Sequence, residues 1–130
     1  MLIDTDVLIW YLRGNENAGK IINANIPFNI SVVSYMELIQ GMRSKGELKV
    51  LQKQLKKWST SIIQIDVNIS TRAMFFVEDY CLSHSLELAD AMIAATAIEN
   101  HEILLTANDK HYGFIPNIRI NKFRPRWKYP

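Results

Sequence analysis

Short apolar runs alternate with amphipathic stretches along the whole chain. The apolar runs are typical of buried strands and cover residues 2–4, 28–33, 61–65, 103–105 and 118–120. The stretches between them predict helices over residues 7–12, 16–25, 35–42, 47–58, 68–83 and 88–100. Because strands separated by helices need crossover connections, the pattern predicts an α/β fold with a short parallel sheet and helices on both faces.

The size and composition favour one compact domain. A chain of 130 residues with 48% apolar residues can bury a single core, so we expect one domain over residues 1–130 with a basic tail at about 121–130. The net charge of +2 is too small to indicate a nucleic-acid-binding protein by itself. One cysteine, Cys81, excludes an internal disulfide, and we expect it in the core.

Neither a secretory signal nor a membrane span is indicated. The opening MLIDTDVLIW has no basic segment ahead of its apolar residues. The longest apolar stretch, residues 88–98, is too short to span a bilayer and contains Asp90. We therefore expect a cytoplasmic protein that does not bind membranes.

Two aspartates stand where the predicted fold makes a carboxylate functional. Asp90 lies in the otherwise apolar segment LADAMIAATAI, where an unpaired carboxylate costs several kcal/mol, roughly, unless it is protonated or binds a cation. Asp4 ends the first strand, and ligands of parallel α/β sheets bind beyond the carboxyl ends of the strands. The structural alternative is that Asp90 caps its helix, and we expect Asp6 to cap the first helix.

Two further acids have structural alternatives of their own. Glu37 completes the capping box Ser34-Tyr35-Met36-Glu37, in which the glutamate would bond the backbone of the cap residue Ser34. Asp109 follows the fourth strand, where aspartate commonly makes a turn. Acids after two strands and at the starts of two helices can nevertheless converge on one edge of the sheet, which makes the four together a candidate site.

Four segments of the chain resemble the motifs of PIN domains of the VapC type. They are LIDTDVLIWYLRGN, SVVSYMELIQG, LELADAMIAATAIEN and LLTANDKHY, and they span residues 2–112. The resemblance implies a three-layer α/β/α PIN-like domain, related to the Rossmann fold.

The resemblance also implies a metal site. Its three central acids would be Asp4, Glu37 and Asp90, and Asn108 and Asp109 compete for the fourth place. We assign the fourth place to the charged Asp109. Supporting polar roles go to the remaining motif residues, namely Asp6, Ser34, Thr106 and Asn108.

Carboxylate ligands suit the chemistry that the family performs. Mg²⁺ and Mn²⁺ favour carboxylate oxygens and water, and such ions generate a water nucleophile for phosphodiester hydrolysis. The resemblance therefore implies a metal-dependent endoribonuclease, the toxin of a toxin–antitoxin pair, with tRNA or another structured RNA as substrate. It further implies a homodimer and a cognate antitoxin protein.

Two basic stretches could bind the phosphates of RNA. The first is the charged helix with Lys45, Lys49, Lys53, Lys56 and Lys57; the second is the tail with Arg119, Lys122, Arg124, Arg126, Trp127, Lys128 and Tyr129. The alternative is a solvated helix face and a poorly ordered tail. His111 could contact phosphate or be structural, and Trp10, Tyr11 and Met42 could form a groove for a partner helix or belong to the core.

Two rival functions use the same residues. A receiver-like signalling domain would place Asp4, Asp6 and Thr106 around a phosphorylated Asp66, but it leaves Asp90 unexplained. A non-cleaving PIN-like module would bind RNA through intact acids without cutting it.

Overall fold

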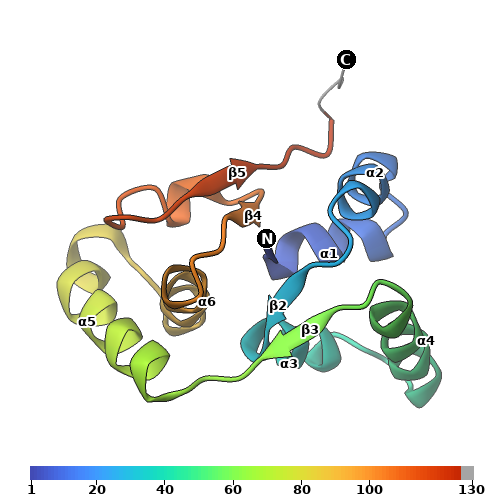
Figure 1. Ribbon diagram of the computed structural model, residues 1–130, viewed down its shortest axis with the longest axis horizontal. Coiled ribbons are helices and arrows are strands. Elements are labelled where there is room, and N and C mark those ends of the chain that lie inside the picture. Colours follow the sequence, from blue (N-terminus) through green and yellow to red (C-terminus); the bar gives the residue numbers. More distant parts are fainter. Residues whose placement is uncertain (127–130) are drawn as a thin grey trace.

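The computed structural model describes residues 1–126 and contains a five-stranded parallel sheet (Figure 1). The strands are β1 (Leu2–Ile3), β2 (Asn29–Ser31), β3 (Ser61–Ile63), β4 (Leu104–Thr106) and β5 (Ile120–Lys122). They stand in the order β3-β2-β1-β4-β5, so β1 is central. Trp127, Lys128 and Tyr129, part of the tail that could bind RNA or be poorly ordered, lie outside the described residues.

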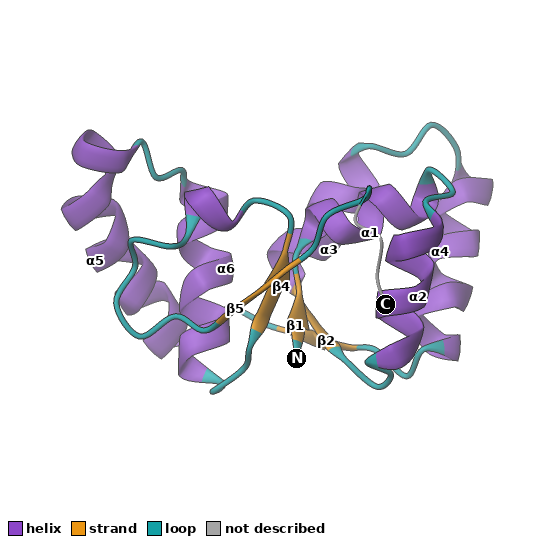
Figure 2. Cartoon of the chain, turned by 90° about the horizontal axis from the view of Figure 1, so that it is seen from above, coloured by secondary structure: helices purple, strands orange, loops and turns teal. Residues whose placement is uncertain are grey.

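Helices cover both faces of the sheet, as the alternating pattern predicts. They are α1 (Thr5–Leu12), α2 (Glu16–Ala24), α3 (Val32–Gln40), α4 (Lys45–Lys57), α5 (Val67–His84) and α6 (Leu88–Glu99), with a short 3-10 helix η1 (Asp109–His111). Figure 2 shows α5 and α6 on one side of the sheet and α1, α2 and α4 on the other. The expected three-layer α/β/α fold is confirmed.

Most residues of the inner strands β1, β2 and β4 are buried on one face of the sheet or the other, whereas the edge strands β3 and β5 are more exposed. Leu2 and Leu104 pack against α5 and α6, whereas their neighbours Ile3 and Leu105 pack against the opposite helices. This alternation follows from the two-residue period of a strand. Trp10, Tyr11 and Met42 are partly buried against the second of these two core clusters.

The starts of two helices differ from the sequence-based expectation. The residue that caps α1 is Asp4 and not Asp6, and the residue that caps α3 is Ser31, whose Oγ accepts a hydrogen bond from the Val33 N–H. The predicted capping box of Ser34 and Glu37 is therefore wrong, because the helix begins three residues earlier, directly at the end of β2.

Two further expectations, on the last strand and on Cys81, also need correction. The last strand is shifted to residues 120–122, where its backbone pairs with that of β4. Cys81 is exposed, because α5 turns Ile69, Ala73 and Phe76 toward the core and position 81 falls outside that stripe.

Among the described residues, no helix is long and apolar enough to cross a membrane.

Replacing Leu104 with alanine tests the burial of β4 between the helical layers. Leu104 is 0% exposed, so Leu104→Ala should lower the free energy of unfolding by roughly 2–5 kcal/mol. Leu82→Ala is the matched control, because Leu82 is 96% exposed and its loss should change little. Urea denaturation of both variants measures the difference, and equal destabilisation would contradict the assigned packing.

Candidate functional site

The first carboxylate of the site is Asp4, which follows the central strand. Its side chain is only 4% exposed and accepts hydrogen bonds from the Thr5 N–H (2.8 Å) and the Thr106 hydroxyl (2.9 Å), with the Tyr112 hydroxyl at 3.1 Å. Burial and the nearby charge of Asp6 raise the pKa of Asp4 to about 7. The carboxyl end of the central strand thus holds a buried acid with a raised pKa.

Asp6 lies beside Asp4 and reaches across to the end of β4. Its Oδ2 accepts hydrogen bonds from the Ala107 N–H (2.9 Å) and, more weakly, from the Thr106 hydroxyl (3.4 Å). Its Oδ1 accepts from the N–H of Val7 at 2.8 Å. Burial raises the pKa of Asp6 as well. Asp6 therefore joins the acidic cluster, where we had expected a helix cap.

Asp90 reaches the same edge from the first turn of α6. Glu87 is the cap residue of this helix, so Asp90 is free of the capping role that was its structural alternative. Its Oδ1 lies 3.2 Å from the Tyr112 hydroxyl and its Oδ2 lies 3.5 Å from Nδ1 of His111. Burial raises the pKa of Asp90.

Tyr112 connects the two aspartates and was missed by the sequence reasoning. Its side chain is completely buried, and its hydroxyl lies between Asp4 and Asp90. The one phenolic proton serves one carboxylate at a time, and burial together with the two acids raises the pKa of Tyr112. The available signal was its place at the end of the segment LLTANDKHY.

Glu37 approaches from α3 through a pair of hydroxyl groups. The Thr5 hydroxyl donates to Glu37 Oε1 at 2.8 Å and lies 2.8 Å from the Ser34 hydroxyl. Ser34 is fully buried within α3 and supports this contact in place of capping the helix. Glu37 itself is exposed, so its carboxylate is accessible from solvent.

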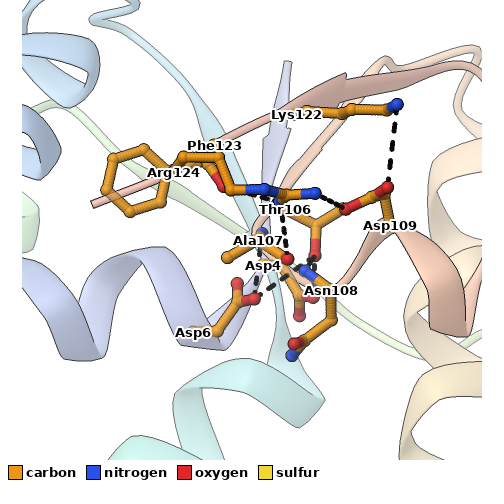
Figure 3. Close-up of polar contacts among 9 residues, drawn as sticks. All are labelled: Asp4, Asp6, Thr106, Ala107, Asn108, Asp109, Lys122, Phe123 and Arg124. Atoms are coloured by element: carbon orange, nitrogen blue, oxygen red, sulfur yellow. Dashed lines mark hydrogen bonds and ion pairs between the residues drawn. The ribbon is translucent and has the colours of Figure 1, made fainter. Parts of the chain in front are cut away.

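Asp109, the expected fourth acid, is held by basic residues. Its Oδ1 lies 2.6 Å from Nη2 of Arg124 and its Oδ2 lies 3.8 Å from Nζ of Lys122 (Figure 3). The hydrogen bond from Arg124 lowers the pKa of Asp109. The Asn108 N–H donates to the Thr106 hydroxyl, and the Asn108 side chain points away from Asp109 in Figure 3.

The donor set fits a hard divalent cation, although its side chains are not yet arranged around one. Among residues 1–126, no group of three His, Cys, Asp or Glu side chains converges in ligating geometry, since the Tyr112 hydroxyl separates Asp4 from Asp90 and Thr5 holds Glu37. In the same range, no lysine or arginine forms an ion pair with Asp4, Asp6 or Asp90. A cation would supply the missing positive charge.

Known proteins resemble this chain in both sequence and fold. The PIN domain model matches residues 1–114. Ribonuclease VapC10 of Mycobacterium tuberculosis is 34% identical across 97% of this chain and 98% of its own length. Ribonuclease VapC19 of the same organism is 30% identical across 91% of this chain and 96% of its own length.

Solved structures agree with these relatives. A chain of a toxin–antitoxin complex from Klebsiella pneumoniae superposes with a TM-score of 0.77 at 27% identity, covering 95% of this chain and 96% of that one. A chain of DNA-bound VapBC from Salmonella typhimurium has the same fold, with a TM-score of 0.80 at 23% identity over 93% of this chain and 96% of that one. The family model and these relatives therefore show that the chain belongs to the PIN-domain family and, within it, to the VapC type.

Proposed function

We propose that this chain is a metal-dependent endoribonuclease that hydrolyses phosphodiester bonds of RNA and acts as the toxin of a toxin–antitoxin pair. The names of its relatives, ribonucleases of the VapC type, support the activity. The observation that carries the proposal is the buried acidic edge, where Asp4 and Asp90 flank one tyrosine hydroxyl without a lysine or arginine partner in residues 1–126.

Asp4, Glu37 and Asp90 would hold Mg²⁺ or Mn²⁺. When bound, such an ion lowers the pKa of a water nucleophile and neutralises charge on the phosphate. Thr106 and Tyr112 donate to Asp4 and fix the direction of its carboxylate. Thr5 does the same for Glu37, so the site is oriented by hydroxyl groups that carry no charge of their own.

Asp6 has a supporting role in this proposal. It is fixed by the backbone N–H of Ala107 at the end of β4 and adds negative charge beside Asp4. That charge strengthens the attraction of the edge for a cation. Asn108 bonds Thr106 through its backbone and so supports the hydroxyl that orients Asp4.

The partners follow from the family. The similar solved structures include a toxin–antitoxin complex and a DNA-bound VapBC complex. We infer a cognate antitoxin, a homodimer and a cytoplasmic location for this chain, with tRNA or another structured RNA as the substrate class to test. The receiver-like alternative is wrong, since the chain is a PIN domain and Asp66 caps α5 through the Ile69 N–H.

Substituting Asp90 tests the nuclease. Asp90→Asn should lower the rate of RNA cleavage at least about a hundredfold, because it removes a charged ligand while keeping the side-chain shape. Cleavage of total tRNA by antitoxin-free protein with Mn²⁺, Mg²⁺ or EDTA measures this.

Asp66→Asn is the matched control, because asparagine caps a helix as well as aspartate does and position 66 lies outside the site. It should cleave like the unmodified chain. The positive control is an active relative. If this chain binds RNA but does not cleave it under any metal condition, the proposed nuclease activity is contradicted and the RNA-binding module is favoured.

The raised pKa of Asp4 predicts how stability depends on pH. In the metal-free protein the folded pKa of about 7 exceeds the ordinary value of 3.8, so the folded state holds the proton more tightly than the unfolded state. The stabilisation is complete below pH 3.8 and is lost as the pH rises through 7. The free energy of unfolding should therefore fall by a few kcal/mol, roughly, toward pH 8.

Asp4→Asn and added metal check the same prediction. Asparagine cannot titrate, so the variant should show a flatter pH dependence in EDTA, although Asp6 and Asp90 contribute with the same sign. Mg²⁺ should stabilise the unmodified protein more at pH 8 than at pH 5, where protons compete for the carboxylates. Thermal unfolding in EDTA and in Mg²⁺ measures both effects, and equal stabilisation by Mg²⁺ at the two pH values would count against a carboxylate metal site.

A further inference from the structure

The last residue of β5 and the segment that follows it bring two basic side chains to the acidic edge. Arg124 donates to Asp109 Oδ1 from Nη2 and to the Ala107 carbonyl from Nη1, at 2.6 and 2.8 Å. Lys122, the last residue of β5, lies with its Nζ 3.8 Å from the other oxygen of Asp109. One acid therefore positions two bases.

Three further contacts hold this segment in place. Phe123 is fully buried, and its N–H donates to the Thr106 carbonyl at 2.8 Å. The amides of Asn15 and Asn17, at the start of α2, donate to the Pro125 carbonyl at 3.2 and 2.9 Å. The bases consequently sit on a backbone that is fastened to both the sheet and a helix.

Ala107 connects Arg124 to the acidic edge by two backbone hydrogen bonds. Ala107 accepts from Arg124 through its carbonyl and donates through its N–H to Asp6 Oδ2 at 2.9 Å (Figure 3). Thr106, which pairs in register with Lys122, donates to Asp4. Positive charge therefore lies directly beside the edge where the scissile phosphate would be bound.

Lys122 is the base with capacity for a ligand. Its side chain is 58% exposed and its separation from Asp109 is long for an ion pair, so a phosphate can approach the ammonium with little desolvation. Arg124 is more buried and is used for the Asp109 and Ala107 contacts.

We infer that Lys122 binds the phosphate backbone of RNA next to the scissile bond, and that Asp109 is the anchor of Lys122 and Arg124 and not a metal ligand. This inference rests on the proposed function, since it gives the substrate of that site a second contact. The ligand class is the phosphodiester backbone of RNA, which an ammonium contacts without reading sequence.

The lysines of α4 provide matched controls. Lys56 and Lys57 end α4 just ahead of β3, whose first residue, Ser61, pairs with Asn29 at the amino ends of the strands. They are exposed and belong to the edge opposite the acids. Their removal changes the net charge by the same amount as removal of Lys122, without touching the site.

The first test measures RNA binding without cleavage. In an Asp90→Asn background, adding Lys122→Gln should weaken binding of a short labelled single-stranded RNA on the order of fivefold and reduce the slope of log affinity against log salt by about 0.7. Lys122→Arg should restore binding, and Lys56→Gln should change it little. An equal effect of Lys122→Gln and Lys56→Gln would overturn the inference.

The second test separates Asp109 from the metal site. Calorimetric titration of the RNA-free protein with Mn²⁺ should give the same affinity for Asp109→Asn as for the unmodified chain and a weaker one for Asp90→Asn. Loss of Mn²⁺ affinity in Asp109→Asn would overturn the anchor role. Neither the RNA-binding measurement nor the Mn²⁺ titration depends on catalysis. Absence of RNA cleavage would therefore refute the proposed nuclease activity, whereas the RNA contact of Lys122 would still be decided by the binding measurement.

Discussion

The burial of negative charge at the carboxyl edge of the sheet is the constraint on which this site depends. Asp4 lies at the end of the central strand, almost without solvent, and is kept there by one backbone N–H and two hydroxyl groups. Such donors orient a carboxylate but bring no positive charge, so the pKa of Asp4 stays raised. A structure built for stability alone would pair this acid with a base or replace it with an apolar residue.

The same carboxylate links elements that are far apart in the sequence. The hydroxyl groups of Thr106, at the end of β4, and of Tyr112, just after η1, lie within hydrogen-bond distance of Asp4. The Tyr112 hydroxyl also lies within hydrogen-bond distance of Asp90 on α6. On the other side, Thr5 joins α1 to Glu37 on α3. The helical layers on both faces of the sheet thus meet at one edge, and the bases near Asp109 lie beside it without neutralising it.

The sequence predicts the fold and part of the site for identifiable reasons. Alternation of apolar residues such as Leu2 and Ile3 predicts strands buried on both faces, and the position of Asp4 after a strand predicts its place at the edge. Asp90 is conspicuous because it interrupts an apolar helix. These features are local in the chain, so pattern and period reveal them.

The rest depends on contacts that no local pattern records. The role of Tyr112 arises from a contact 108 residues away in the sequence, and that of Asp109 from Arg124 on a later segment. Ser34 and Glu37 have the spacing of a capping box, but Ser31 already ends β2 and caps the helix. Asp6 has the sequence position of a helix cap, but in the structure it accepts a hydrogen bond from the Ala107 N–H at the end of β4.

Anomalous diffraction from crystals of the antitoxin-free protein soaked in Mn²⁺ tests the central claim most directly. The account predicts an anomalous peak bound by Asp4 and Asp90, with Glu37 turned toward it and Asp109 still on Arg124. An ion coordinated by Asp109, or an acidic edge that stays without metal at saturating Mn²⁺, would contradict it.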